Sequence, residues 1–323
     1  AAEHKQKWEK IEDNRLGQDF EILPAGSLTA RTRALLKVED GCNNFCSYCI
    51  IPYARGRVRS MPLDAAVAEA QKLAAEGYRE IVINGIEISS WGQEWKDGSV
   101  LRDLLAAICA AVPDVRIRLG SLEPRTIDEA FCRALAGFPN LCPQFHLSLQ
   151  SGCTATLRRM RRVYTAEQYA EVVENIRSAY GDRPVSFTTD CICGFPGETE
   201  ADFEESRAFL KKIGFLKVHV FPYSRRSGTP AYDFPGQIHE RDKQERSRTM
   251  NAAAEAIRKE VLAGYEGMED DVLLETPLSE TLFTGYTRLY VPVVVSAPGH
   301  ASGEIVRVRL GAYDGERVRA ALV

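Results

Sequence analysis

The chain has 323 residues, of which 45% are hydrophobic, and its formal net charge is −4. The length accommodates one large domain and a small one, and the composition excludes collagen-like, disordered and low-complexity proteins. No apolar run reaches the roughly 18 residues that a bilayer-spanning helix needs, and the charged N-terminus lacks the apolar core of a secretory signal. We therefore expect a cytoplasmic protein whose nine cysteines stay reduced. The net charge argues against a general electrostatic affinity for nucleic acid, but it allows a local basic patch.

Short apolar runs alternate with amphipathic helical segments over most of the chain. The predicted strands are 34–38, 80–84, 115–121, 145–150, 185–195 and 215–221. Three of the helices between them begin with a predicted capping box, at Thr126–Glu129, Thr165–Gln168 and Thr199–Asp202. This alternation predicts an α/β fold, a parallel (β/α)6 barrel that is partly or fully closed, with helices outside. The active site of such a barrel lies at the C-terminal ends of its strands.

Three cysteines follow the first predicted strand at C-x3-C-x2-C spacing, at Cys42, Cys46 and Cys49. Gly41 before them and Pro52 after them indicate a tight loop. Cysteine thiolates hold iron–sulfur clusters, and three local thiolates would leave one iron of a four-iron cluster free for a non-protein ligand. A structural zinc is the alternative, although it needs a fourth ligand that no second C-x2-C or H-x3-H pair supplies. Three packed, unliganded cysteines are the third interpretation.

Glycine and polar residues stand at the ends of the other predicted strands, where they would meet the cysteine loop at one rim. These strand ends are Asn84–Glu87, Ser121–Pro124, Ser148–Gly152, Asp190–Thr199 and Phe221–Ser224. Directly after the loop, Arg55, Arg57 and Arg59 are spaced two apart. In an extended segment this spacing places all three on one face, which either contacts phosphates or is solvated.

The last third of the chain has a different pattern. A charged stretch between Gly236 and Tyr265 predicts one long helix, packed through Ile257 and Val261. Beyond residue 270, short strands predict a small closed β-barrel. Its outer arginines either bind RNA or are solvated charges of an ordinary alternating strand.

The segment GCNNFCSYCIIPYARGRVRS at 41–60 resembles the cluster loop of the radical S-adenosylmethionine enzymes and, within them, of the methylthiotransferases. The similarity continues through NGIEISSWG, RLGSLEP, HLSLQSGCTATLRRM, TTDCICGFPGETEADF and VFPYSRRSGTPA, and it covers nearly all of 34–323. CSYCIIPYARG and GIEISSWG are most similar to the branch that modifies threonylcarbamoyladenosine in tRNA. The alternatives are the branches that act on isopentenyladenosine in tRNA or on a ribosomal protein. A non-catalytic RNA-binding protein with a structural zinc is the alternative of a different class.

The resemblance implies that Cys42, Cys46 and Cys49 hold a 4Fe-4S cluster, whose free iron binds the amino and carboxylate groups of S-adenosylmethionine. It places Gly85 and Glu87 at the methionine amino group. The further cofactor-binding positions that it implies are Tyr48, Glu123, Ser148, Gln150 and Arg162. By analogy, one electron from the cluster cleaves the cofactor into methionine and a 5′-deoxyadenosyl radical. The radical removes hydrogen from C2 of the adenine, and a methylthio group takes its place. No catalytic side chain is implied beyond the cluster ligands.

The resemblance also implies the domains and partners. Residues 1–30 would be a lead-in, 31–268 the radical S-adenosylmethionine domain and 269–323 a TRAM domain that binds RNA. The partners would be tRNA and an electron donor such as flavodoxin or ferredoxin, without a membrane, and the protein would be a monomer. The RNA-binding residues that we expect are Arg55, Arg57, Arg288, Arg307 and Arg309. Arg288 stands where the family usually has a glutamate.

Members of the family begin with a further domain that has three more cysteines for a second 4Fe-4S cluster. Residues 1–41 contain no cysteine, so we expect a truncated or processed fragment. Such a fragment should cleave S-adenosylmethionine without completing sulfur insertion.

Overall fold

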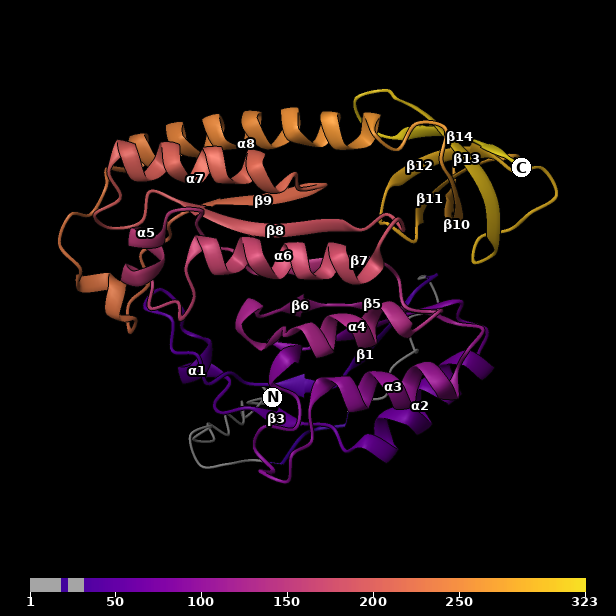
Figure 1. The fold of residues 1–323 in the computed structure, drawn as a ribbon, viewed down its shortest axis with the longest axis horizontal. Coiled ribbons are helices and arrows are strands. Elements are labelled where there is room, and N and C mark those ends of the chain that lie inside the picture. The colour runs from indigo at the N-terminus through magenta and orange to yellow at the C-terminus, as the bar shows by residue number, and fades with distance from the viewer. Residues whose placement is uncertain (1–18, 23–31) are drawn as a thin grey trace, which may run out of the picture.

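The computed structural model describes residues 19–22 and 32–323 (Figure 1), so most of the predicted lead-in lies outside the described residues. Parallel strands form two adjoining sheets, in the orders β1-β4-β5 and β6-β7-β8-β9. Their bounds are β1 Ala34–Lys37, β4 Glu80–Asn84, β5 Arg116–Leu119, β6 Ser121–Leu122, β7 Gln144–Leu147, β8 Ser186–Cys193 and β9 Lys217–Pro222. All six predicted strands are confirmed, β7 with an earlier end than expected.

The two sheets meet at Gly120, which divides the predicted strand 115–121 into β5 and β6. The Gly120 N–H donates to the Ile83 carbonyl oxygen at 2.8 Å, and a Cβ there would lie 3.0 Å from the same oxygen. Because β5 pairs with β4 and β6 pairs with β7, the strands form one curved partial barrel. All four residues of β5 are buried, including Arg116 and Arg118.

Helices cover the outside of the partial barrel (Figure 1). They are α1 Ile51–Ala54, α2 Leu63–Ala75, α3 Leu101–Ala111, α4 Glu129–Gly137, α5 Thr154–Arg159, α6 Ala166–Tyr180, α7 Glu200–Ile213 and α8 Glu240–Ala263. Smaller elements are β2 Glu39–Asp40, β3 Arg59–Ser60 and the 3-10 turns Ile88–Ser90, Pro124–Thr126 and Pro230–Asp233. The apolar faces of these helices and the strands share one hydrophobic core. No helix in the described ranges is long and apolar enough to cross a membrane.

Two of the three predicted capping boxes are confirmed. The Thr165 and Thr199 side chains accept from the backbone N–H groups at the third position of α6 and α7. The box predicted at Thr126 is wrong, because Thr126 ends a 3-10 turn. Asp128 caps α4 instead, and its carboxylate accepts from the Phe131 N–H at 2.7 Å.

The predicted long helix is α8, which leads into a small barrel with its own core. This barrel is closed, in the strand order β10-β11-β12-β14-β13, as the sequence predicts. Its strands are β10 Glu269–Pro277, β11 Leu282–Thr287, β12 Pro292–Ser296, β13 Ile305–Tyr313 and β14 Val318–Leu322. Figure 1 shows the small barrel at the end of the parallel strands opposite to α1.

Candidate functional site

The cysteine loop connects β2 to α1 beside the C-terminal end of β1. Gly41 begins it with φ +83°, and a Cβ there would lie 2.0 Å from the Arg57 carbonyl oxygen, so only glycine fits. Cys42, Cys46 and Cys49 carry free thiols, the first two buried and the third half-buried.

Hydrogen bonds to distant segments fix the middle of this loop. The Ser47 N–H donates to the Met160 carbonyl oxygen at 3.0 Å, and the Ser47 hydroxyl donates to the Arg159 carbonyl oxygen at 2.8 Å. The Ala231 N–H donates to the Ser47 carbonyl oxygen at 2.8 Å. The loop is therefore held from both sides by segments more than a hundred residues away in the sequence.

The three loop sulfur atoms do not form a close-set group of metal ligands in the described residues. Among the described residues, Cys153, Asp202 and Glu205 have donor atoms that all lie within 4.8 Å of one another, and the loop cysteines do not. Two thiolates on one zinc are at most about 4.6 Å apart, since a Zn–S bond is about 2.3 Å. The described loop is therefore not prearranged around a single zinc ion. Burial raises the pKa of Cys42 to about 12, so metal binding there must release its proton.

A buried network lies against Cys46. The Arg162 guanidinium is 3.2 Å from the Cys46 sulfur, and it also donates to the Glu123 carboxylate. Arg162 Nε donates to the Tyr164 hydroxyl at 3.0 Å, which donates in turn to the carbonyl oxygens of Ser148 and Leu149. Burial raises the pKa of Glu123, although Arg162 opposes the shift. Three predicted cofactor residues, Glu123, Ser148 and Arg162, therefore form one connected group beside the loop.

Glu87 and Gly85 lie at the end of β4, where a second carboxyl group accompanies them. The Glu87 carboxylate accepts from the Ser89 N–H at 2.9 Å and from the Ser90 hydroxyl. Glu39 accepts from the Glu87 N–H at 2.8 Å, and a Cβ on Gly85 would lie 2.6 Å from the same carboxyl oxygen. Gly85 thus makes room for Glu39, which our sequence analysis missed. The signal was a charged pair, Glu39–Asp40, directly after an apolar run.

A cavity of about 310 Å³ adjoins the loop at the C-terminal ends of the strands. Tyr48, Cys49 and Gln150 line it, so two of the predicted cofactor residues meet a cluster cysteine there. Phe221, near the end of β9, and Asp190, in the middle of β8, also line it. The combination of aromatic, carboxylate and thiol groups can hold a polar molecule that has a flat ring.

The arginines after the loop do not form the expected extended face. Arg55 caps the C-terminus of α1, and Arg59 lies in β3, where its guanidinium donates to the Arg55 carbonyl oxygen at 2.8 Å. Arg57 stacks over the Phe45 ring, 4.7 Å from its centroid. The prediction of one extended segment is therefore wrong.

The arginines predicted to bind RNA in the small barrel differ in their contacts. Arg307 and Arg309 on β13 are exposed and form ion pairs with Asp271 at 3.2 Å and Glu269 at 2.8 Å. Arg288 instead donates to the carbonyl oxygens of Pro139 and Leu141, at 2.6 and 2.9 Å, in the large domain. Arg288 therefore joins the two barrels, a role that our sequence analysis did not predict.

Residues 36–210 match the Radical SAM superfamily model. The chain is 38% identical over 296 residues to threonylcarbamoyladenosine tRNA methylthiotransferase MtaB of Bacillus subtilis, covering 90% of this chain and 65% of that protein. It is 37% identical over 292 residues to the protein of the same name from Chlamydia pneumoniae, covering 90% and 68%. The chain belongs to the radical SAM methylthiotransferases. A further relative is tRNA-2-methylthio-N(6)-dimethylallyladenosine synthase of Carboxydothermus hydrogenoformans, 36% identical over 280 residues, with 86% and 63% covered.

This radical SAM chain spans about two thirds of the length of the curated relatives that it matches. Among solved structures, it resembles the radical S-adenosylmethionine methyltransferase TsrM from Kitasatospora setae, with a TM-score of 0.52 and 19% identity over 61% of this chain and 38% of that chain. This likeness confirms the fold of the partial barrel. Membership of the superfamily implies a 4Fe-4S cluster and S-adenosylmethionine, and the three free thiols on one fixed loop fit that cluster.

Proposed function

We propose that this chain is the catalytic part of a tRNA methylthiotransferase that modifies C2 of threonylcarbamoyladenosine next to the anticodon. The observation that carries the proposal is the loop of three free thiols beside a cavity at the strand ends, in a chain 38% identical to the named Bacillus subtilis enzyme. For this chain we propose cleavage of S-adenosylmethionine, the step that the three loop cysteines support.

In this proposal, Cys42, Cys46 and Cys49 hold the 4Fe-4S cluster. When bound there, the cluster supplies the electron that cleaves S-adenosylmethionine and so starts hydrogen removal from the substrate. Arg162 presents its positive charge to the Cys46 sulfur. Glu87, beside Gly85, would accept a hydrogen bond from the methionine amino group. The residues that line or support the rest of the cofactor pocket are Tyr48, Glu123, Ser148, Gln150 and Arg162.

We further propose that residues 31–268 are the radical SAM domain and that 269–323 are a TRAM domain that binds tRNA. Arg307 and Arg309 are the exposed candidates for phosphate contacts, and Arg55 and Arg57 are candidates beside the cysteine loop. An electron donor such as flavodoxin or ferredoxin would reduce the cluster, and the protein would act as a cytoplasmic monomer.

Anaerobic reconstitution with iron and sulfide tests the cluster. We expect the protein to turn brown, to bind iron and sulfide in equal amounts and to cleave S-adenosylmethionine when reduced. Cys46→Ser should lose all three properties, whereas Cys109→Ser, a buried cysteine on α3, should keep them. Colourless protein that contains zinc would reject the proposal.

Mass spectrometry of tRNA nucleosides from cells that lack the gene tests the substrate. We expect threonylcarbamoyladenosine to lose its methylthio group. If dimethylallyladenosine loses its methylthio group instead, the substrate is the one in the name of the 36% identical relative.

A further inference from the structure

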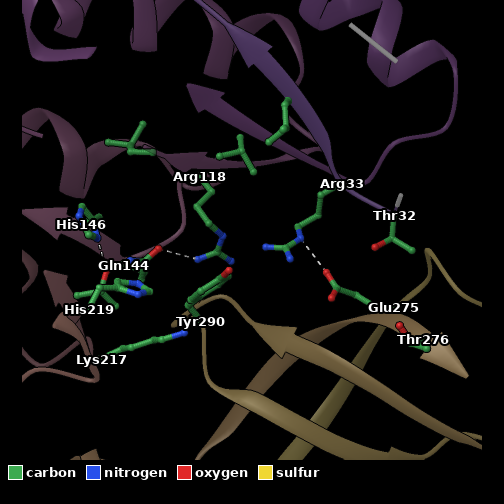
Figure 2. Close-up of a pocket in the computed structure, with 14 residues that line it drawn as sticks. Thr32, Arg33, Arg118, Gln144, His146, Lys217, His219, Glu275, Thr276 and Tyr290 are labelled. Atoms are coloured by element: carbon green, nitrogen blue, oxygen red, sulfur yellow. Dashed lines mark hydrogen bonds and ion pairs between the residues drawn. The ribbon is translucent and has the colours of Figure 1, made fainter. Parts of the chain in front are cut away.

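A second cavity, of about 530 Å³, lies between the small barrel and the N-terminal ends of strands β1 and β9 (Figure 2). One wall comes from the parallel strands, including Arg118 of β5 and Lys217 at the start of β9. The other wall comes from the small barrel, through Glu275 and Tyr290. Its volume is typical of a small-molecule site. The cofactor and substrate chemistry proposed above does not use it.

Positive charge exceeds negative charge around this cavity. Arg33, Arg118 and Lys217 line it, and its one lining carboxylate, Glu275, lies 2.7 Å from Arg33. Glu80 does not line the cavity, and it forms an ion pair with Arg118 at 2.7 Å. These pairs use both carboxylates and leave the Lys217 charge uncompensated. The cavity therefore favours an anion.

Two of the lining donors have no partner. Among the described residues, Lys217 and His219 make no side-chain hydrogen bond or ion pair, and the nearest aromatic ring to His219 is His146, at 6.1 Å. Figure 2 shows the Lys217 side chain pointing toward Tyr290, on whose ring the Arg33 and Arg118 guanidiniums also stack, at 5.5 and 4.9 Å. Lys217 and His219 are two residues apart on β9, Arg118 lies on β5, and Arg33 directly precedes β1. Cationic groups from three segments therefore line one space.

We propose that this cavity binds a small organic phosphate, with its anionic group between Lys217, His219 and Arg33. A phosphate offers three acceptor oxygens to donors from several directions, whereas a carboxylate offers two in one plane. The apolar part of the ligand would lie against the apolar side of the cavity, formed by Leu35, Val82 and Leu119. Because the walls come from both barrels, the ligand would also hold them together.

Titration calorimetry on the whole chain tests this proposal with phenyl phosphate, inorganic phosphate and phenol. We expect phenyl phosphate to bind most tightly, inorganic phosphate more weakly and phenol not at all. Lys217→Ala should weaken phenyl phosphate binding roughly tenfold, the usual cost of one charge-assisted hydrogen bond. His219→Gln should also weaken it. Lys217 is exposed, so its loss leaves the fold intact.

The matched control is Lys211→Ala, which removes the same charge from an exposed position on α7 and should leave binding unchanged. Arg307→Ala, on the outer surface of the small barrel, is a second control and should also leave binding unchanged. Absence of phosphate binding at millimolar concentration, equal effects of Lys217→Ala and Lys211→Ala, or loss of binding in Arg307→Ala would each overturn the proposal.

Discussion

Glu39 of β2 is a fully buried carboxyl group that contacts the residues after β4, within the candidate site. Burial, reinforced by the nearby charges of Glu87 and Asp40, raises its pKa to about 9. One of its oxygens accepts from the Glu87 N–H, and the other has no hydrogen-bond partner. Glu39 is therefore protonated at neutral pH in the folded protein, and it adds no negative charge beside the cysteine loop.

This protonation predicts a pH dependence of stability. Between the ordinary carboxyl pKa of about 4.5 and the folded value of about 9, the folded state keeps a proton that the unfolded state releases. Stability should fall as pH rises through this window, by at most about 1.4 kcal/mol per pH unit. Glu39→Gln should remove this slope, while the exposed control Glu76→Gln should keep it. Urea unfolding at several pH values measures both; parallel curves for wild type and Glu39→Gln would refute the prediction.

The three cluster cysteines could be predicted from the sequence because their spacing is local, whereas their neighbours could not. Arg162 reaches Cys46 across 116 positions, and Glu39 reaches Glu87 across 48. The pairing of β1 with β4 brings Glu39 to Glu87, and the curvature of the barrel brings Arg162 to Cys46. The sequence therefore predicts the functional residues of the loop itself, but not the distant residues that contact them.

At the scale of elements, α4 shows how a local pattern can favour the wrong residue. Thr126 and Glu129 have capping-box spacing, but Pro124 starts a 3-10 turn that includes Thr126 and displaces the start of the helix. Asp128 then supplies the cap. We expect Asp128→Ala to cost about 1 kcal/mol of stability, whereas Asp128→Asn, which keeps an acceptor oxygen, costs little. Denaturant unfolding compares the two variants, and equal losses would contradict this assignment of the cap.

Strand β13 offers the test of RNA binding by the small barrel. Glu269 of β10 pairs with Arg309 and lies 3.7 Å from Arg307, and exposed ion pairs of this kind add little stability. Glu269→Gln should therefore leave folding unchanged and free Arg309 for phosphates, while Arg307 keeps its ion pair with Asp271, so tRNA should bind more tightly. Combined Arg307→Ala and Arg309→Ala substitutions should weaken binding and lower its salt dependence. Filter binding at several salt concentrations measures both effects. Unchanged binding in all variants would place the RNA elsewhere.

At the scale of the whole molecule, alternation of strands and helices sufficed to predict a partial barrel followed by a small closed one. The sequence did not predict how the two are joined, because that joint depends on buried charges far apart in the chain. Arg118 of β5 donates to the carbonyl oxygens of Thr287 and Arg288 at 3.1 Å each. Although burial opposes the shift, Arg118 holds the pKa of Glu80 below its usual value.

This joint predicts that Arg118 makes the largest single contribution to the joint unfolding of the two barrels. Arg118→Met leaves Glu80 buried without its main partner and removes both donors to the small barrel, so we expect a loss of about 3–5 kcal/mol. With the contact broken, calorimetry should resolve two transitions in place of one, because each barrel has its own core. Arg133→Met, an exposed arginine on α4, is the control and should keep a single transition. A single transition at the wild-type temperature in Arg118→Met would mean that the remaining contacts, among them those of Arg288, suffice to join the barrels.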